Sequence, residues 1–150
     1  MSELDRYDDR ILSVLGREGR IPNVALAERV GLSPSACLRR VQELERRGVI
    51  RGYRAVLDPA ALGRGFLAYV AVGLNEHSRP SQEAFERAVA DVAEVRECHN
   101  VTGAVEYLLR VETADLAAYK RLHADVLGTL PQVASITTYV VMDSSKDLRG

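Results

Sequence analysis

Apolar residues recur at helical spacing in three stretches of the first third of the chain. The first helix is predicted to start after Asp5, whose carboxylate suits an N-cap, and the second after Asn23. The positions expected to face a core are Tyr7, Ile11 and Leu15 in the first helix and Val24, Ala27 and Val30 in the second. Gly31 follows at the place where a chain leaves a helix in the left-handed conformation.

The third helix is predicted to run from Ser33 to about Arg47, before Gly48. Ser33 is a good N-cap, and Pro34 fits the first helical position because no backbone amide is needed there. Its inner side is expected to carry Leu38, Val41 and Leu44. Its outer side then carries small and charged residues, namely Ser35, Arg39, Glu43 and Arg46, with Arg40 at the edge.

The pattern changes after residue 48. Residues 49–57 read as a strand or wing, and 58–65 (DPAALGRG) have the composition of a linker. Strands are expected at 66–74, 95–102, 106–112 and 133–142, and helices are expected to start at Ser81 and Asp115. The helix positions expected to be buried are Phe85, Ala88, Val89 and Val92, then Leu116, Tyr119, His123 and Val126.

This order, β-α-β-β-α-β, predicts a ferredoxin-like unit in which right-handed crossovers place both helices on one face of the sheet. Strand 66–74 is apolar on both sides, so the other face is expected to need a cover. A second copy of the chain is the simplest cover, which predicts a homodimer. The fold class is therefore α+β, with domains at 1–57 and 66–143, a linker at 58–65 and a polar, frayed tail at 144–150.

Composition narrows the class of protein. With 47% apolar residues the chain reads as globular. No apolar run reaches the roughly 18 residues of a membrane span, and the acidic first ten residues do not read as a signal peptide. Two cysteines in different segments, Cys37 and Cys98, suit a reduced cytoplasm. Residues 1–55 hold 11 arginines against 8 acidic residues, whereas the rest of the chain is acidic overall.

A helix, a tight turn and a second, basic helix are typical of the helix-turn-helix, whose second helix lies in the DNA major groove. Small residues at the helix start let the backbone approach the bases, and arginine binds guanine or phosphate. The alternative is an ordinary solvated face, since exposed arginine on a helix is common. The combination of Gly31, Ser33, Pro34 and the basic face favours double-stranded DNA as the partner.

At these residues the chain resembles the Lrp/AsnC family, the feast/famine transcription regulators, and most of all its leucine-responsive branch. The matching runs include GRIPNVALAERVGLSPSACLRRVQELERRGVIRGYRAVLDPAALG, ECHNVTG, EYLL and TTYVV, and together they span about residues 1–142. The resemblance implies an N-terminal winged helix-turn-helix, a C-terminal effector domain, dimers that commonly assemble into octamers, and a small amino acid bound between subunits. The DNA contacts that it implies are Ser33, Pro34, Ser35, Ala36, Arg39 and Arg40, with Arg46, Arg47 and Arg51 as phosphate contacts.

The effector site that the resemblance implies lies around a glycine turn. Its residues here are His99, Thr102, Gly103, Ala104 and Glu106, with Thr137 and Thr138 on the last strand. The family often reads Gly-Asp-x-Asp where this chain has Gly-Ala-Val-Glu. Because Ala104 removes a carboxylate, a DNA-binding architectural protein without an effector is a second hypothesis.

No metal, cofactor or catalytic site is expected. Cys98 and His99 are neighbours on a strand and point to opposite faces, so they do not chelate one ion easily. No catalytic triad, phosphate loop or paired-carboxylate cleft is evident, so the chain is not expected to be an enzyme. An amino-acid-binding regulatory subunit of an enzyme is a more remote alternative.

Overall fold

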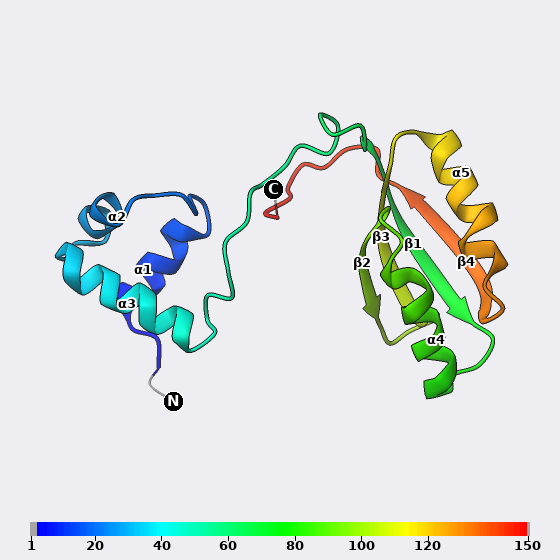
Figure 1. Ribbon diagram of the computed structural model, residues 1–150, viewed down its shortest axis with the longest axis horizontal. Helices are drawn as coiled ribbons and strands as arrows, with labels where there is room; N and C mark the ends of the chain where they lie inside the picture. Colours follow the sequence, from blue (N-terminus) through cyan, green and yellow to red (C-terminus); the bar gives the residue numbers. More distant parts are fainter. Residues whose placement is uncertain (1–2, 150) are drawn as a thin grey trace. The chain divides into compact units, whose positions relative to one another are not determined.

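The computed structural model describes residues 3–149 and divides at residues 55 and 56 into two compact units (Figure 1). The N-terminal unit holds α1 (Arg6–Leu15), α2 (Asn23–Val30) and α3 (Pro34–Arg46). The C-terminal unit holds β1 (Phe66–Leu74), α4 (Arg79–Ala90), β2 (Val95–Asn100), β3 (Tyr107–Thr113), α5 (Leu116–Asp125), a 3-10 turn η1 (Leu127–Thr129) and β4 (Val133–Val140). The α+β class with an N-terminal helix-turn-helix is confirmed.

One apolar cluster holds the three N-terminal helices together. Its fully buried members are Ile11, Leu26, Ala27, Val30, Cys37 and Leu44. Asp5 caps α1 as predicted, and it forms a reciprocal capping box with Asp8. Gly31 ends α2 with φ 77°, the left-handed conformation that glycine adopts without steric cost.

Three local expectations for this unit are wrong. Asn23 does not cap α2, because its carboxamide instead donates to the carbonyl oxygen of Pro34 at 2.9 Å. Val24 is 66% exposed, since the buried stripe of α2 begins with Leu26. On α3, Val41 and Leu44 pack in the core as predicted, but Leu38 is exposed and Cys37 is buried in its place.

The predicted strand at residues 49–57 is also absent from the described structure. The segment is bonded back to α3, since the amides of Val49 and Ile50 both donate to the carbonyl oxygen of Leu44. The Tyr53 hydroxyl donates to Glu45 at 2.9 Å. A strand needs a neighbouring strand to take its backbone hydrogen bonds, and residues 3–55 contain none.

The C-terminal unit is the predicted βαββαβ sheet. Its strands lie in the order β2-β3-β1-β4, and each neighbouring pair is antiparallel (Figure 1). Alternate residues of β1 and β3 pack under α4 and α5 in a second cluster, in which the Phe85 and Tyr107 rings lie 4.7 Å apart. Tyr107, Leu109 and Val111 alternate along β3 with the less buried Leu108 and Arg110, and all three are buried.

The helix starts were predicted less well than the strands. Ser78 caps α4 instead of Ser81, because Pro80 is tolerated in the first helical turn and the helix therefore begins before it. Asp115 caps α5 as expected, but Leu116 is 63% exposed and Leu122 takes its place in the core. Strands β2 and β4 each end two residues earlier than predicted.

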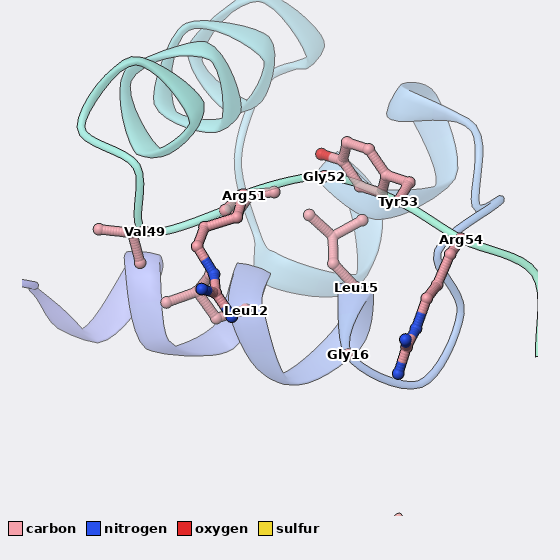
Figure 2. Close-up of a pocket in the computed structure, with 9 residues that line it drawn as sticks. Leu12, Leu15, Gly16, Val49, Arg51, Gly52, Tyr53 and Arg54 are labelled. Carbon is pink, nitrogen blue, oxygen red and sulfur yellow. The ribbon is translucent and has the colours of Figure 1, made fainter. Parts of the chain in front are cut away.

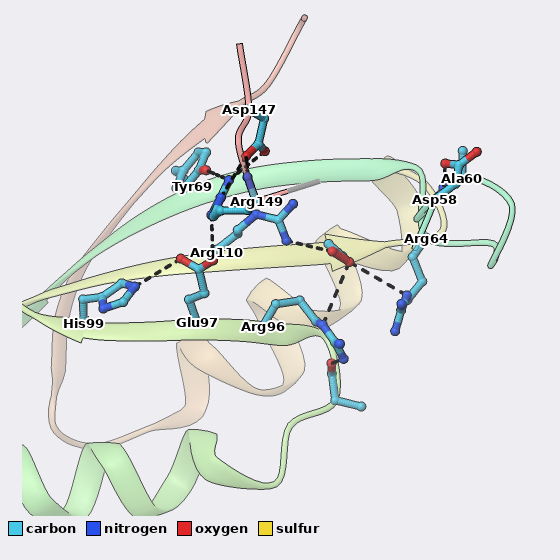
Figure 3. A network of polar contacts seen from close by, with 12 residues as sticks. Asp58, Ala60, Arg64, Tyr69, Arg96, Glu97, His99, Arg110, Asp147 and Arg149 are labelled. Carbon is cyan, nitrogen blue, oxygen red and sulfur yellow. Dashed lines mark hydrogen bonds and ion pairs between the residues drawn. The ribbon is translucent and has the colours of Figure 1, made fainter. Parts of the chain in front are cut away.

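The face of the sheet turned away from α4 and α5, called the open face here, is less apolar than its sequence indicated. Strand β1 contributes Tyr69 and Ala71 to it, whereas β2 and β3 contribute Glu97, Arg110 and Glu112 (Figure 3). The tail was expected to be frayed, yet Arg149 donates to Glu97 at 2.6 Å and to the Tyr69 hydroxyl at 2.8 Å. This face therefore combines apolar and ionic contacts.

Candidate nucleic-acid interface and effector site

The first turn of α3 is presented to solvent by its cap. The Ser33 hydroxyl accepts the amide of Ala36 at 3.3 Å, and Pro34 occupies the first turn. Ser33, Pro34 and Ser35 are exposed, and Ala36 is half-buried. Because Asn23 of α2 is bonded to the Pro34 carbonyl, the two helices of the motif are fastened together at this end. The arrangement leaves small side chains and a positive helix end open to a phosphate or base.

The outer face of α3 carries arginines with different partners. Arg39 is exposed, and no ion pair or hydrogen bond of its side chain is seen within residues 3–149. Arg46 binds Glu43 through two hydrogen bonds of 2.8 and 2.6 Å, which raise the pKa of Arg46 and lower that of Glu43. The exposed pair of Arg46 and Glu43 is weak, so a DNA phosphate can compete for Arg46. Arg47 is half-buried.

Arg40 lies on a different side of α3 and is already engaged. Its Nη1 lies 2.8 Å from Asp5 Oδ2 and 2.9 Å from Asp8 Oδ1, both at the start of α1. The hydrogen bond to Asp5, then that to Asp8, raises the pKa of Arg40. Of the arginines expected to contact DNA, Arg40 is therefore the one that the structure uses to join two helices.

Arg51 follows α3 beside a groove of about 650 Å³ in the N-terminal unit. Leu12, Leu15, Val49 and Tyr53 contribute its apolar lining. In Figure 2 the Arg51 side chain extends toward Leu12 of α1. Arg51 lies four residues beyond Arg47, the C-cap of α3, and its cation suits a phosphate contact.

The glycine turn after β2 exposes three of the predicted effector residues. Thr102, Gly103 and Ala104 are exposed, and Gly103 has φ 143°. Glu106, at the end of this turn, is folded inward. Its Oε2 accepts the Leu74 amide at 2.6 Å and its Oε1 lies 2.6 Å from Nδ1 of His77. The Leu74 amide lowers the pKa of Glu106, burial opposes this, and His77 adds to the lowering.

Ser135 and Glu106 both lie beside Gly73 at the end of β1. A side chain on Gly73 would lie 2.4 Å from the Ser135 hydroxyl and 3.8 Å from Glu106 Oε2, so this position is closely packed by polar atoms. Sequence reasoning missed His77 as a partner and Ser135 altogether. A glycine inside an otherwise apolar strand is the signal that indicates such a close approach.

The remaining predicted effector residues are not brought together. The strand register places His99, Leu108, Ala71 and Thr137 in one row across the sheet, which separates His99 from Thr137 by three strand spacings, about 14 Å. Thr138 points to the opposite face, where its hydroxyl meets that of Tyr119. Thr137 lies on the open face beside Ser135, whereas His99, on the same face, lies at the opposite edge of the sheet.

No group of three or more His, Cys, Asp or Glu side chains in residues 3–149 is arranged to hold a metal ion. None of the helices in the same residues has the length and apolar character needed to cross a membrane.

Comparison with known proteins assigns both units. Residues 4–51 match the winged helix-turn-helix DNA-binding family, and residues 67–150 match the Lrp/AsnC ligand binding domain. The leucine-responsive regulatory proteins of Salmonella typhimurium and Escherichia coli are 45% identical to the chain over 144 residues, which is 96% of this chain and 88% of theirs.

Solved structures agree over nearly the full length. A transcriptional regulator of Neisseria meningitidis, in complex with L-methionine, has a TM-score of 0.92 and 36% identity, covering 97% of this chain and 94% of its own. A feast or famine regulatory protein of M. tuberculosis, also with L-methionine, has a TM-score of 0.86 and 32% identity, covering 97% and 96%. The relatives are transcriptional regulators, which leaves the enzyme-subunit alternative without support. With a helix-turn-helix in one unit and the family's ligand-binding fold in the other, the chain belongs to the Lrp/AsnC family of DNA-binding transcriptional regulators.

Proposed function

We propose that the chain regulates genes of amino-acid metabolism by sequence-specific DNA binding that responds to a free amino acid. The observation that carries this proposal is the open first turn of α3, with Ser33 and Ser35 exposed beside Arg39, in a chain whose other unit has the family's ligand-binding fold. The domains proposed are residues 1–57 for DNA and 66–143 for the effector and assembly. The place of action is the cytoplasm, where a bacterial regulator meets DNA.

Six of the proposed DNA contacts are exposed, and Ala36 and Arg47 are half-buried. Ser33, Pro34, Ser35, Ala36 and Arg39 face the bases and the nearest phosphates, and Arg46, Arg47 and Arg51 bind phosphate. Arg40 is left out of this set because two carboxylates hold it. Two subunits present paired α3 helices to half-sites separated by roughly 34–36 Å, one turn of DNA.

The proposed homodimer forms through the open face, and dimers assemble further to an octamer. The exposed Leu108 and Tyr139 on this face support the proposal, because apolar side chains there lose contact with water when a second sheet covers them. Leu108→Asp is expected to give monomers in size-exclusion chromatography with light scattering. A stable dimer of this variant would place the interface elsewhere.

The proposed effector site centres on Glu106 and the turn 102–104, completed by a neighbouring subunit. Glu106 supplies a negative charge for an ammonium group, and the backbone amides of a glycine turn suit a carboxylate. Ser135 and Thr137 add hydroxyl groups on the same face. The methionine complexes of two relatives support a small, apolar L-amino acid. His99 lies too far away across the sheet, and Thr138 faces the other side of it, so neither belongs to the proposed site.

The test is a thermal-shift screen of the full chain against the twenty amino acids, each compared with its D-enantiomer where one exists. A ligand that binds the native state at 100 times its Kd stabilises it by about 2.7 kcal/mol, which gives a clear rise in Tm. Glu106→Gln is expected to abolish the shift, whereas Ala104→Asp, which restores the carboxylate common in the family, is expected to enlarge it. A shift with the hit that is unchanged in Glu106→Gln would move the site away from this turn.

A second candidate is an architectural DNA-binding protein with no effector. It is favoured by Ala104 and by the fact that both oxygens of Glu106 already have partners inside the subunit. Such a protein would bind unrelated duplexes with similar affinity and a steep dependence on salt. No thermal shift with any amino acid, together with equal binding to selected and scrambled duplexes, would favour it.

A further inference from the structure

Two helices of the N-terminal unit are joined by a cluster of three charged side chains, Asp5, Asp8 and Arg40. Each carboxylate divides its two oxygens between two tasks. Asp5 Oδ1 accepts the amides of Tyr7 and Asp8, at 2.8 and 3.0 Å, and Asp8 Oδ2 accepts the amide of Asp5 at 3.1 Å. The other two oxygens, Asp5 Oδ2 and Asp8 Oδ1, both bind Nη1 of Arg40, at 2.8 and 2.9 Å. The two carboxylates that cap α1 therefore also bind the guanidinium of Arg40 on α3.

The cluster is buried on the Asp8 side and open on the Asp5 side. Asp8 is 8% exposed, and among residues 3–55 it is the one charged residue that is buried. The side chain of Arg40 is 27% exposed and that of Asp5 is 49% exposed. The Arg40 guanidinium also lies 5.3 Å from the centre of the Tyr7 ring, close enough for a cation–π contact. A buried salt bridge is weak evidence for stability, and in some proteins it instead fixes one arrangement of the elements that it joins.

Arg40 directly follows Arg39, which points into solvent on the same helix. We propose that Arg40 is a positioning residue for DNA recognition: bound by Asp5 and Asp8, it fixes the rotation of α3 about its own axis, and thereby the direction in which Ser35 and Arg39 meet the DNA. Only a small rotation of α3 about its axis is compatible with correct DNA contacts. On a helix about 5–6 Å in radius, a rotation of about 10° moves a side chain by about 1 Å. Binding geometry is lost beyond about 0.5 Å.

The arrangement also argues against Arg40 as a phosphate contact. Its charge is balanced by two carboxylates, so a phosphate would meet no uncompensated cation at this point. Arg39 is the matched contrast, because it is the same residue type on the same turn and makes no ion pair within the described part of the chain.

The experiment compares six variants of the full chain. Four test the cluster: Arg40→Gln, Arg40→Lys, Asp8→Asn, and the double variant Arg40→Gln with Asp8→Asn. The matched controls are Arg39→Gln alone and Arg39→Gln with Asp8→Asn. The probes are a duplex enriched from a random library by the wild-type protein and a scrambled duplex of the same composition. Affinity for each is measured over a range of salt concentrations. Circular dichroism melting sets the temperature at which every variant is folded.

If Arg40 positions α3, Arg40→Gln and Asp8→Asn each lower the ratio of enriched to scrambled affinity, by about tenfold, and leave the salt slope unchanged. The double variant is then no worse than the poorer single variant, since both remove one interaction. Arg40→Lys retains most of the wild-type ratio, because a single nitrogen, Nη1, makes both contacts. Arg39→Gln, by contrast, lowers affinity whether or not Asp8 is replaced.

Two results would overturn the proposal. A salt slope reduced by about one in Arg40→Gln, with Asp8→Asn binding as tightly as the wild type or more tightly, would show that Arg40 contacts a phosphate. A lower Tm in both variants with an unchanged affinity ratio would show that the cluster stabilises the unit without directing recognition. If Asp8→Asn does not fold, Asp5→Asn replaces it, because asparagine still caps a helix but carries no charge.

Discussion

Arginines on α3 and arginines on the open face of the sheet lie in opposite surroundings. Arg39 and Arg46 of α3 are exposed, and the side chain of Arg46 is 73% exposed even though it pairs with Glu43. On the sheet, the side chain of Arg110 is only 14% exposed and lies 2.7 Å from the buried carboxylate of Glu112 (Figure 3). Arg64 and Arg96 approach the same carboxylate at 3.8 and 4.0 Å.

The difference shows that the counter-charge, and not the number of arginines, decides what a basic cluster can do. Exposed cations with weak partners can exchange them for phosphates. Cations gathered around a buried carboxylate cannot leave it without a large cost, so they fix the conformation of the unit. Arg40 belongs to the second kind although it lies on the helix that carries the first.

The largest effect is expected when Glu112, the buried carboxylate that binds the arginines of the sheet, is removed. Glu112→Ala leaves Arg110 without its partner and brings Arg64 and Arg96 close together uncompensated, which is expected to lower the free energy of unfolding by about 3 kcal/mol. Urea unfolding measures this. Glu83→Ala, which removes the exposed partner of Arg79, is the control and should cost less than about 0.5 kcal/mol. Similar losses in both variants would contradict the contrast between the two arginine clusters.

On the DNA side, Arg39→Ala is expected to weaken binding to a selected duplex by about 1–3 kcal/mol and to relax the preference at one base position. The reason is that Arg39 projects from the exposed face of α3 with no partner of its own within residues 3–149. Affinity measured on duplexes with single base changes locates that position. Equal losses on selected and random duplexes would show that Arg39 touches phosphate only.

A smaller effect separates capping from DNA contact by comparing one serine cap in each unit. Ser33 caps α3 and Ser78 caps α4, with hydroxyl-to-amide distances of 3.3 and 3.4 Å. Ser33→Ala and Ser78→Ala are each expected to cost about 1 kcal/mol of stability. Only Ser33→Ala should also weaken DNA binding, as measured by a gel shift below the melting range. A matching loss of binding in Ser78→Ala would mean that stability alone explains the effect.

The smallest effect concerns pH. The Leu74 amide and His77 hold the pKa of Glu106 below its ordinary value of 4.5, so the native state gains stability from the ionised carboxylate. This gain is present above pH 4.5 and is lost as the pH falls below it. The Tm of the wild type should therefore fall more between pH 5 and pH 3 than that of Glu106→Gln.

Glu43→Gln is the matched change in the N-terminal unit, because the pKa of Glu43 is also lowered, by Arg46. Its effect on the same pH dependence should be smaller and should vanish in high salt, since this pair is exposed. A flat response of the wild type over this range would show that Glu106 gains nothing in the native state.

Interactions between residues close together in the sequence determined much of the secondary structure of this protein. Caps at Asp5, Ser33 and Asp115, the left-handed Gly31 and the period of strand β3 could all be predicted, because each depends on residues within one helical turn or on simple alternation. The βαββαβ order then followed from the sequence of elements. The errors on α2 and α3 arose where nearby apolar residues competed for the core, Val24 with Leu26 and Leu38 with Cys37.

Tertiary structure decided which polar side chains are available. Arg40 and Asp8 are 32 residues apart, and Glu106 meets the Leu74 amide over the same separation, so no local pattern records either partnership. The strand register sets Thr137 three strand spacings away from His99, and Arg149 returns to the sheet from the chain end. The physical reason is that periodicity encodes which face of an element is apolar, whereas the partner of a charge is set only when elements distant in the chain pack together.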